Sequence, residues 1–403
     1  MQPPHIRPSA VQILACGAAI VTLSMGIRHG FGLWLQPIIT ERGWTREDFA
    51  LALAVQNLVW GAIGPLTGMW ADRVGAFRPL VAGALLYAIG LMGMAAASAP
   101  WAFVAATGLV IGAAQSGTTY AVIYGVIGRQ LDPTRRSWAM GVVASAGSFG
   151  QFLMLPVEHQ LIERFGWQPS LWLLAGTVLA IVPLAWGLRE PSHRPQTAGR
   201  SGSGSGAALL EALRTPSYLW LTAGYFVCGF QVVFIGVHLP AFLKDQGLPA
   251  QVGTYALALI GLFNVVGTYA AGQLGQKWPR RYILAFIYSA RSVAIVAYLG
   301  TPISAPSTYV FASVMGLLWL STIPPTNATV AQIFGVSHLS MLAGLVFFSH
   351  QIGSFLGVWL GGYVFDQTGS YDWVWWSAVA LGVAAALANL PVREQPLVRP
   401  HLA

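Results

Sequence analysis

Twelve apolar segments, each close to the length of a membrane-spanning helix, constrain this chain more than any other feature. They lie at about 10–38, 49–70, 79–98, 101–129, 137–160, 169–188, 216–243, 250–275, 281–300, 307–331, 338–365 and 372–391. A helix needs ~20 residues to cross the ~30 Å hydrocarbon core of a bilayer. Helices also satisfy every backbone hydrogen bond within their own segment, as lipid requires. The sequence therefore predicts an all-α membrane protein with twelve transmembrane helices.

Composition supports lipid as the main partner of the surface. The chain is 55% hydrophobic and only 8% charged, whereas soluble domains carry about 25% charged residues. Cys16 and Cys228 both lie in apolar runs, so neither a disulfide framework nor a metal site is predicted. The long first apolar run is interpreted as a retained span and not as a signal peptide.

The two halves of the sequence repeat each other. Gly43 and Gly68 match Gly247 and Gly272 at a distance of 204 residues, and residues 163–167 match residues 366–370 at 203. Such a repeat predicts two pseudo-symmetric six-helix bundles. We place the N-terminal bundle at 1–188, a polar, flexible Gly/Ser-rich linker at 189–215 and the C-terminal bundle at 216–403.

Lysine and arginine predict the orientation. Loops on the side of the two termini hold fifteen of these residues, and loops on the other side hold four. By the positive-inside rule, both termini and the linker are cytoplasmic. The net charge of +8 then reports topology, and no nucleic-acid partner is predicted. The short tails favour a multi-pass protein of the bacterial inner (plasma) membrane, which we expect to be a monomer.

A charged motif follows the second segment. Its members are Gly68, Asp72, Arg73, Gly75 and Arg78, and an eroded copy follows the eighth segment. With twelve spans in two duplicated halves, this motif resembles that of the major facilitator superfamily. The resemblance implies two bundles that rock around a central site near the midplane. It also implies a gating role for the five motif residues, which would pair with neighbouring helices across the inner face. The alternative is a capped inner turn that only sets topology.

Two arginines, Arg28 and Arg291, lie inside apolar segments, whereas all thirteen acidic residues are assigned to loops or span ends. A buried arginine costs at least ~2.5 kcal/mol, so such charges are functional candidates. With no internal carboxylate to pair with, a small-molecule anionic substrate is the predicted partner. The alternatives are an Arg28 that reaches the outer headgroups and an Arg291 that braces the second bundle through backbone carbonyls or Asn264.

Histidines are the candidates for proton coupling, because an ordinary histidine exchanges protons near neutral pH. His350 lies near the middle of the eleventh segment, where it serves as a proton or substrate ligand or as a packing residue. His29 follows Arg28 directly. Successive helical side chains point about 100° apart, so we expect that Arg28 and His29 do not both face one narrow site.

Polar residues complete the predicted substrate site. Tyr120 and Tyr124 are four apart in the fourth segment, so they stack on one helix face and can donate hydroxyls to a carboxylate. The alternative is hydrogen bonding between helices. Gln231 lies in the seventh segment, and the double proline Pro324–Pro325 predicts a break in the tenth. Weaker candidates are Asn57, Gln151 and Asn264.

Within the superfamily, the first and eleventh segments resemble the monocarboxylate and oxalate/formate porters. That group carries an arginine in the eighth span, where this chain has Asn264. The resemblance implies a secondary active transporter that moves a small organic anion by proton symport or exchange. The alternatives are an exporter of drugs or other hydrophobic compounds, and a membrane sensor or scaffold. We find no nucleotide loop, metal-ligand cluster or nucleophile–base pair, so the chain is not expected to be an enzyme or to hold a cofactor.

Overall fold

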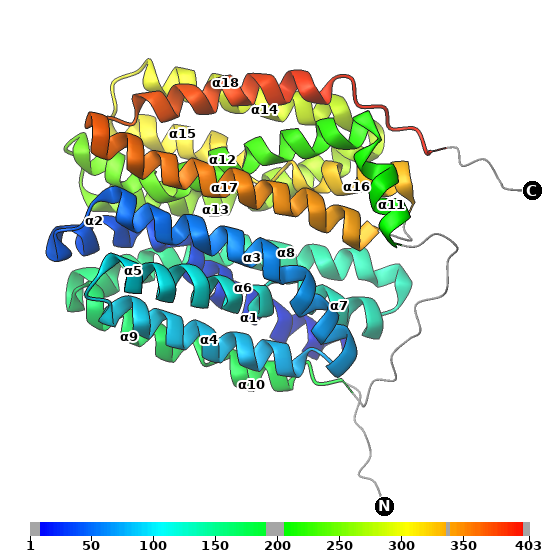
Figure 1. Cartoon of the computed structure of the whole chain (residues 1–403), viewed down its shortest axis with the longest axis horizontal. Helices are drawn as coiled ribbons and strands as arrows, with labels where there is room; N and C mark the ends of the chain where they lie inside the picture. Colours follow the sequence, from blue (N-terminus) through cyan, green and yellow to red (C-terminus); the bar gives the residue numbers. More distant parts are fainter. Residues whose placement is uncertain (1–8, 191–204, 336–338, 398–403) are drawn as a thin grey trace, which may run out of the picture.

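The structure is a computed structural model, and it describes residues 9–190, 205–335 and 339–397. Within these ranges every regular element is a helix and there is no strand, so the all-α prediction is confirmed. The helices run roughly parallel to one long axis in two layers, one from each half of the chain (Figure 1).

The lower layer in Figure 1 is the N-terminal half. Its elements are α1 (Ala10–His29), α2 (Phe31–Arg42), α3 (Arg46–Val74), α4 (Phe77–Ala96), α5 (Pro100–Phe103), the π-helical turn η1 (Val104–Val110), α6 (Ile111–Thr118), α7 (Tyr120–Gln130), α8 (Pro133–Phe165), α9 (Trp167–Val178) and α10 (Ile181–Trp186).

The upper layer is the C-terminal half. Its elements are α11 (Ser205–Leu213), α12 (Pro216–Asp245), α13 (Ala250–Lys277), α14 (Arg280–Leu299), α15 (Ala305–Leu318), α16 (Ile323–Phe334), α17 (Leu339–Thr368) and α18 (Asp372–Asn389). Helix α11 falls inside the segment predicted as a flexible linker. The rest of that linker, residues 191–204, lies outside the described residues.

Eleven helical stretches of the described chain are long and apolar enough to cross a membrane. They correspond to the first eleven predicted segments. The twelfth, α18, is only 18 residues long and has Asp372 and Asn389 at its ends. It packs against α12 and α14, so it belongs to the same bundle as the longer helices.

Four predicted spans are interrupted. The first breaks at Gly30 between α1 and α2, where the carboxyl group of Glu158 occupies the position at which a Cβ of residue 30 would lie. The fourth breaks at Thr119 between α6 and α7, and the sixth breaks at residues 179–180 between α9 and α10. The tenth breaks after Leu318, and α16 then begins with the double proline at its first turn. Proline fits there because the first amides of a helix have no intrahelical acceptor.

Glycine explains why the repeat is visible in the sequence. Gly43, Gly166, Gly247 and Gly369 all adopt positive φ, at 69°, 77°, 77° and 70°. Each lies at the end of a helix with a positive φ, which glycine adopts more readily than other residues. The pairs Gly43/Gly247 and Gly166/Gly369 occupy equivalent turns in the two halves, as the repeat predicts.

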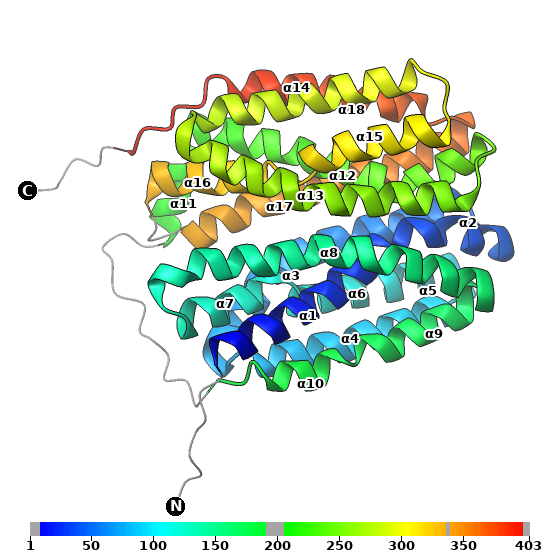
Figure 2. The ribbon, with the colours of Figure 1, turned by 180° about the vertical axis from the view of Figure 1, so that it is seen from behind.

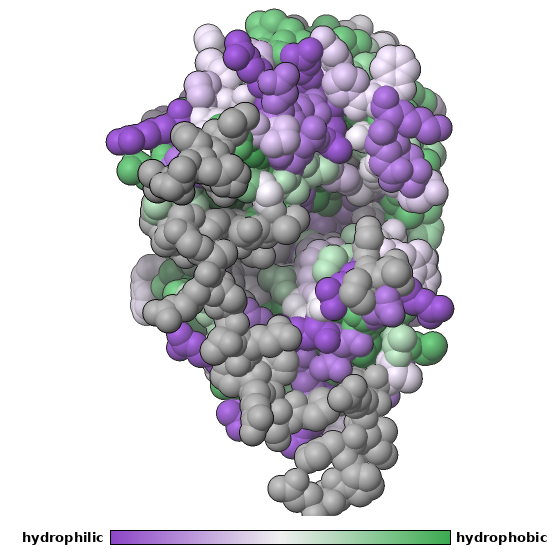
Figure 3. All heavy atoms as spheres, turned by 90° about the vertical axis from the view of Figure 1, so that its right-hand side faces the viewer, coloured by the Kyte–Doolittle hydropathy of each residue, from purple (hydrophilic) through white to green (hydrophobic). Residues whose placement is uncertain are grey.

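These four turns lie at one end of the molecule, which we call the distal face. The opposite end, the terminal face, holds the start of α1, Glu190 and the last described residue, Leu397. The two halves meet where α3 packs on α17 and α8 packs on α13. The second of these contacts is visible from behind in Figure 2. Viewed onto the terminal face, hydrophilic residues lie above and below a hollow between the layers (Figure 3).

Candidate functional site

A small cavity lies between the two halves, around the break in the first span. Its volume is about 40 Å³, which leaves room for only a few water molecules. Helices α1, α2, α3 and α8 line it from the N-terminal half. Helices α12 and α13 and Trp319 line it from the C-terminal half. A site built by both halves is reshaped whenever the halves move relative to each other.

Arg28 is the charged group of this cavity. Its Nη2 donates a hydrogen bond to Asn57 Oδ1 at 2.5 Å, and its guanidinium carbon lies 4.7 Å from the centre of the Trp60 ring. Nε is buried and has no hydrogen-bond partner within the described chain. Arg28 therefore rests on a neutral amide and an aromatic face, and neither cancels its charge.

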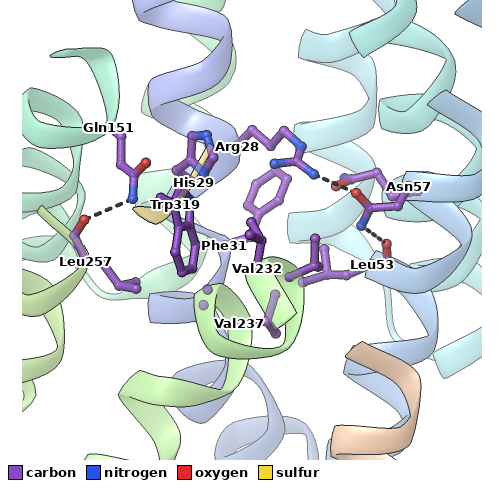
Figure 4. Close-up of a pocket in the computed structure, with 14 residues that line it drawn as sticks. Arg28, His29, Phe31, Leu53, Asn57, Gln151, Val232, Val237, Leu257 and Trp319 are labelled. Atoms are coloured by element: carbon purple, nitrogen blue, oxygen red, sulfur yellow. Dashed lines mark hydrogen bonds between the residues drawn. The ribbon is translucent and has the colours of Figure 1, made fainter. Parts of the chain in front are cut away.

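His29 lines the same cavity, which corrects our expectation that the two side chains would not share one site. Arg28 extends toward Asn57, and His29 lies on the side of Trp319 and Gln151 (Figure 4). The two side chains point in different directions, but both reach the cavity between the bundles. Gln151 lines the cavity as well and donates to the carbonyl of Leu257 at 2.9 Å.

The remaining lining is mostly apolar. It comprises Phe31, Leu53, Val232, Val233, Val237, Leu257 and Trp319, with Gln56 and the backbone of Gly32 and Gly236. None of the described residues that line the cavity is Asp or Glu. A guanidinium in a mostly apolar cavity lined by no carboxylate is an environment suited to an anion, because an incoming negative charge would be the first to neutralise it.

Tyr120 and Tyr124 are half-buried on α7, outside the lining of the cavity. Their ring centroids lie 5.7 Å apart, as expected for positions four apart on a helix. Tyr120 lies within electrostatic range of Arg28. The structure thus brings one of the two tyrosines into the neighbourhood of the predicted anchor.

Arg291 and Gln231 are brought together, away from the cavity lining. Arg291 is fully buried; it donates to the carbonyls of Leu318 (Nη2, 2.7 Å) and Trp319, and to Gln231 Oε1 at 3.3 Å. Gln231 donates in turn to the carbonyl of Ala378 at 2.8 Å. These contacts favour the bracing role, in which Arg291 fixes the break after α15 and so holds Trp319 in place.

His350 is buried on α17. Its Nδ1 lies 3.1 Å from Gln351 Oε1, and its ring packs against Phe347 and Tyr225 with centroids 6.0 and 5.0 Å apart. It does not line the described cavity. These contacts are more typical of a histidine that packs between helices than of one that exchanges protons with a cavity.

Glu158 corrects the assignment of every acidic residue to loops or span ends. It lies on α8 and is fully buried, with 0% exposure. The indole Nε1 of Trp34 donates to its Oε2 at 3.0 Å. The sequence position near the end of a predicted span concealed this burial, because α8 continues to Phe165.

The distal face is closed by contacts between the halves. Arg46 at the start of α3 makes a bidentate ion pair with Asp245 at the end of α12, with both N–O distances at 2.7 Å. It also donates to the Tyr371 hydroxyl at 2.6 Å. The carboxylate of Asp366 accepts the backbone N–H of Glu47 at 2.6 Å, a favourable position at a helix N-terminus. We call these contacts the distal latch.

A weaker counterpart lies on the other side of the pseudo-two-fold. Gln251 at the start of α13 donates to Glu163 near the end of α8 at 2.9 Å. Glu163 and Asp366 are equivalent in the sequence repeat, and Gln251 is equivalent to Glu47. The repeat therefore places the acceptors Glu163 and Asp366 at equivalent positions of the distal face. Nothing in the linear sequence indicated that they pair with the opposite half.

The charged motif lies at the terminal face and is paired within the N-terminal half. Arg129 at the end of α7 bridges Asp72 at 2.6 Å and Glu190 at 2.8 Å. Glu190 also accepts the backbone N–H of Ala76 at 3.2 Å. Burial raises the pKa of Glu190, but the hydrogen bonds and the charge of Arg129 outweigh burial and hold that pKa below its ordinary value.

The other motif residues lie on the same turn between α3 and α4 or close to it. Gly75 ends α3 with φ of 82°, a backbone conformation that favours glycine. Gly68 has open space around its Cα, and Arg73 and Arg78 are exposed. Asp72 is itself 69% exposed on its side chain, so it remains available to a second partner.

Comparison with known proteins agrees with this architecture. The sequence model of the Major Facilitator Superfamily matches residues 14–336. The chain belongs to the major facilitator superfamily. It is similar to the "Uncharacterized MFS-type transporter YcxA" of Bacillus subtilis (strain 168), with 25% identity over 354 residues that cover 85% of each protein.

It is also similar to "Monocarboxylate transporter 13" of Bos taurus, at 23% identity over 376 residues that cover 92% of this chain and 86% of that protein. A similar fold is seen in the crystal structure of a bacterial homologue of the human lysosomal transporter Spinster, in an inward-facing and occupied conformation. The TM-score is 0.76 at 15% identity, with 96% of this chain and 97% of that one covered. This superfamily member is thus a membrane transporter and not an enzyme.

Proposed function

We propose that this transporter moves a small, monocarboxylate-like organic anion by alternating access, with Arg28 as the anchor for the anion. The observation that carries the proposal is a guanidinium between the two halves whose charge no carboxylate of the cavity lining neutralises. The apolar lining accommodates the carbon skeleton of the anion, and Asn57 and Trp60 hold the guanidinium in position.

The distal latch and the hollow at the terminal face support an inward-facing state for this structure. The similar Spinster homologue was also crystallised in an inward-facing conformation. We assign the terminal face to the cytoplasm of a bacterial inner membrane, in line with the distribution of Lys and Arg. Transport then requires the latch to open while the terminal face closes.

The motif residues Gly68, Asp72, Arg73, Gly75 and Arg78 are proposed as the gate at the terminal face. In the present state Asp72 forms an ion pair with Arg129 of its own bundle. Its exposure leaves it free to contact the opposite bundle when the face closes. Arg129 and Glu190 would keep the turn in shape during that movement.

The test is uptake into proteoliposomes of labelled lactate, pyruvate, oxalate, formate and benzoate, each with and without an inward proton gradient. We expect saturable uptake of at least one anion, at least tenfold slower in Arg28→Gln and partly retained in Arg28→Lys. Stimulation by the gradient would identify symport, and stimulation by anion inside the vesicle would identify exchange. Arg164→Gln is the matched control, because Arg164 is exposed on α8.

Two outcomes would overturn the proposal. If no anion is taken up and lipophilic dyes are exported, the protein is the exporter of hydrophobic compounds that the sequence left open. If uptake occurs but Arg28→Gln behaves like Arg164→Gln, the anion site lies elsewhere.

A further inference from the structure

Glu158 is a buried carboxyl group near the cavity whose chemistry the proposed function does not use. It is fully buried. One oxygen, Oε2, accepts the indole N–H of Trp34, whereas Oε1 is buried without a hydrogen-bond partner in the described chain. Buried polar groups that only support a fold are normally satisfied. An orphaned carboxyl oxygen therefore points to a functional role.

Its location connects it to the anion site. A Cβ built on Gly30 would lie 1.8 Å from Oε2 of Glu158, so the carboxyl group rests directly on the backbone two residues after Arg28. Tyr87 of α4 lies within electrostatic range of both Glu158 and Arg28. Glu158 is thus behind the wall of the cavity, on the side where the first span breaks.

The carboxyl group is buried in the neutral form more readily than in the charged form. An ionised carboxylate away from water costs several kcal/mol unless cations or several donors stabilise it. Glu158 has one N–H donor and no cation within ion-pair distance among the described residues. A proton on Oε1 removes that cost in the present conformation.

Helix α8 and the helices near Glu158 carry other titratable groups, several of them at the far end of their helix. They include Cys16, Arg28 and His29 on α1, Glu41 and Arg42 on α2, Tyr87 on α4, Tyr120, Tyr124 and Arg129 on α7, Tyr255, Tyr269 and Lys277 on α13, and Arg135, Arg136, His159, Glu163 and Arg164 on α8 itself; α9 carries none. His159 pairs with Glu163 at 3.1 Å. Arg28 lies two residues before Gly30, against which the carboxyl group of Glu158 rests.

We propose that Glu158 carries the proton that accompanies the anion. The inference rests on the proposed anion transport and assigns its coupling to symport. A single arginine neutralises one negative charge, so an anion bound at Arg28 disfavours loss of the proton from a carboxyl group nearby. Glu158 therefore keeps its proton while the anion is bound and releases it only after the anion has left. The anion and the proton then cross together, and the loaded site carries no added net charge.

The break at Gly30 supplies the access that coupling needs. Glu158 lies seven residues before the end of α8, about 10 Å from the distal face at 1.5 Å per residue. Trp34 of α2 covers it, and α2 packs on α12 of the other half, with Gly32 against the backbone of Gly236 and Val237. Opening the distal latch separates α2 from α12, which would uncover Glu158 to protons from that side.

The first test compares two modes of transport in proteoliposomes for whichever of the five anions the wild type takes up. In Glu158→Gln, we expect the proton gradient to lose its effect on uptake, while exchange of labelled for unlabelled anion stays within about threefold of wild type. If Glu158 had only a structural role, its substitution would lower proton-driven uptake and anion exchange together. Equal proton stimulation in Glu158→Gln and wild type would overturn the proposal.

The second test needs no transported anion, so it separates this inference from the proposed function. Infrared spectra of the reconstituted protein should contain a carboxylic-acid C=O band at neutral pH that Glu158→Gln removes. Asp372→Asn is the control, because Asp372 is exposed at the start of α18 and contributes no such band. If Glu158→Gln removes no such band, Glu158 is ionised in this state and the proposal fails.

A third variant tests the role of the indole. Trp34→Phe removes the N–H that stabilises the carboxylate, so proton-driven uptake should persist to higher pH than in wild type. If this variant leaves the pH profile of proton-driven uptake unchanged, Trp34 does not set the proton affinity of Glu158.

Discussion

The distal latch makes a quantitative prediction about the conformational equilibrium of the protein. Replacing Asp245 by Asn removes the negative partner of Arg46 but keeps the size and shape of the side chain. Arg46 would retain the Tyr371 hydroxyl, and the contact of Asp366 with α3 would remain. Only the state with a closed distal face contains the Arg46–Asp245 pair, so the change should favour opening of that face.

The size of the effect follows from the exposure of the pair. Side-chain exposure is 8% for Arg46 and 31% for Asp245. Breaking a fully buried pair costs about 3–5 kcal/mol, and an exposed pair contributes about 0–1 kcal/mol. An intermediate value of about 2 kcal/mol changes the ratio of distally closed to distally open molecules roughly thirtyfold.

Pulsed electron resonance can measure this ratio. Spin labels at Ser98→Cys and Thr301→Cys report the separation of the two halves across the distal face, because these residues follow the distal ends of α4 and α14. Both are exposed. Cys16 and Cys228 would first be replaced by Ala. We expect Asp245→Asn to add or enlarge a population with the longer distance.

The matched control is Asp372→Asn, which removes an exposed carboxylate from the same face without touching Arg46. Its distance distribution should equal that of the parent. If Asp245→Asn also leaves the distribution unchanged, the ion pair does not contribute to closure, and the reasoning from its geometry is wrong.

Three further predictions concern stability. The pKa of Glu190 is lowered in the folded state, so its ionised carboxylate stabilises the fold fully above the ordinary pKa of about 4.5. This stabilisation is lost as pH falls through the lower folded-state pKa. In Glu190→Gln, the melting temperature should therefore fall less steeply with acid than in wild type. Arg291→Leu leaves two carbonyls unpaired and should cost about 3 kcal/mol and lower the melting temperature, whereas an unchanged melting temperature would exclude the bracing role. Gly267→Ala forces a Cβ to within 1.8 Å of the Leu317 carbonyl and should cost at least about 1–3 kcal/mol, while Gly64→Ala, with nothing within 4 Å, should melt like wild type.

The sequence identified features that depend on neighbouring positions along the chain. Apolar length predicted the helices, and the double proline predicted the break before α16. The repeat located Gly43 and Gly247 because both end a helix at positive φ, a requirement that side chains elsewhere do not change. Arg28 was found for the same reason, since a charge within an apolar run is recognisable without any knowledge of its partners.

Only the tertiary structure decided which groups meet. Arg46 and Asp245 are 199 positions apart, and each alone resembles an ordinary loop charge. Glu158 looked like a residue at the end of a span because hydropathy does not reveal that α2 and Trp34 cover it. Burial and pairing arise from the packing of one bundle on the other. They also change with the conformational state, which a linear pattern of residues does not encode.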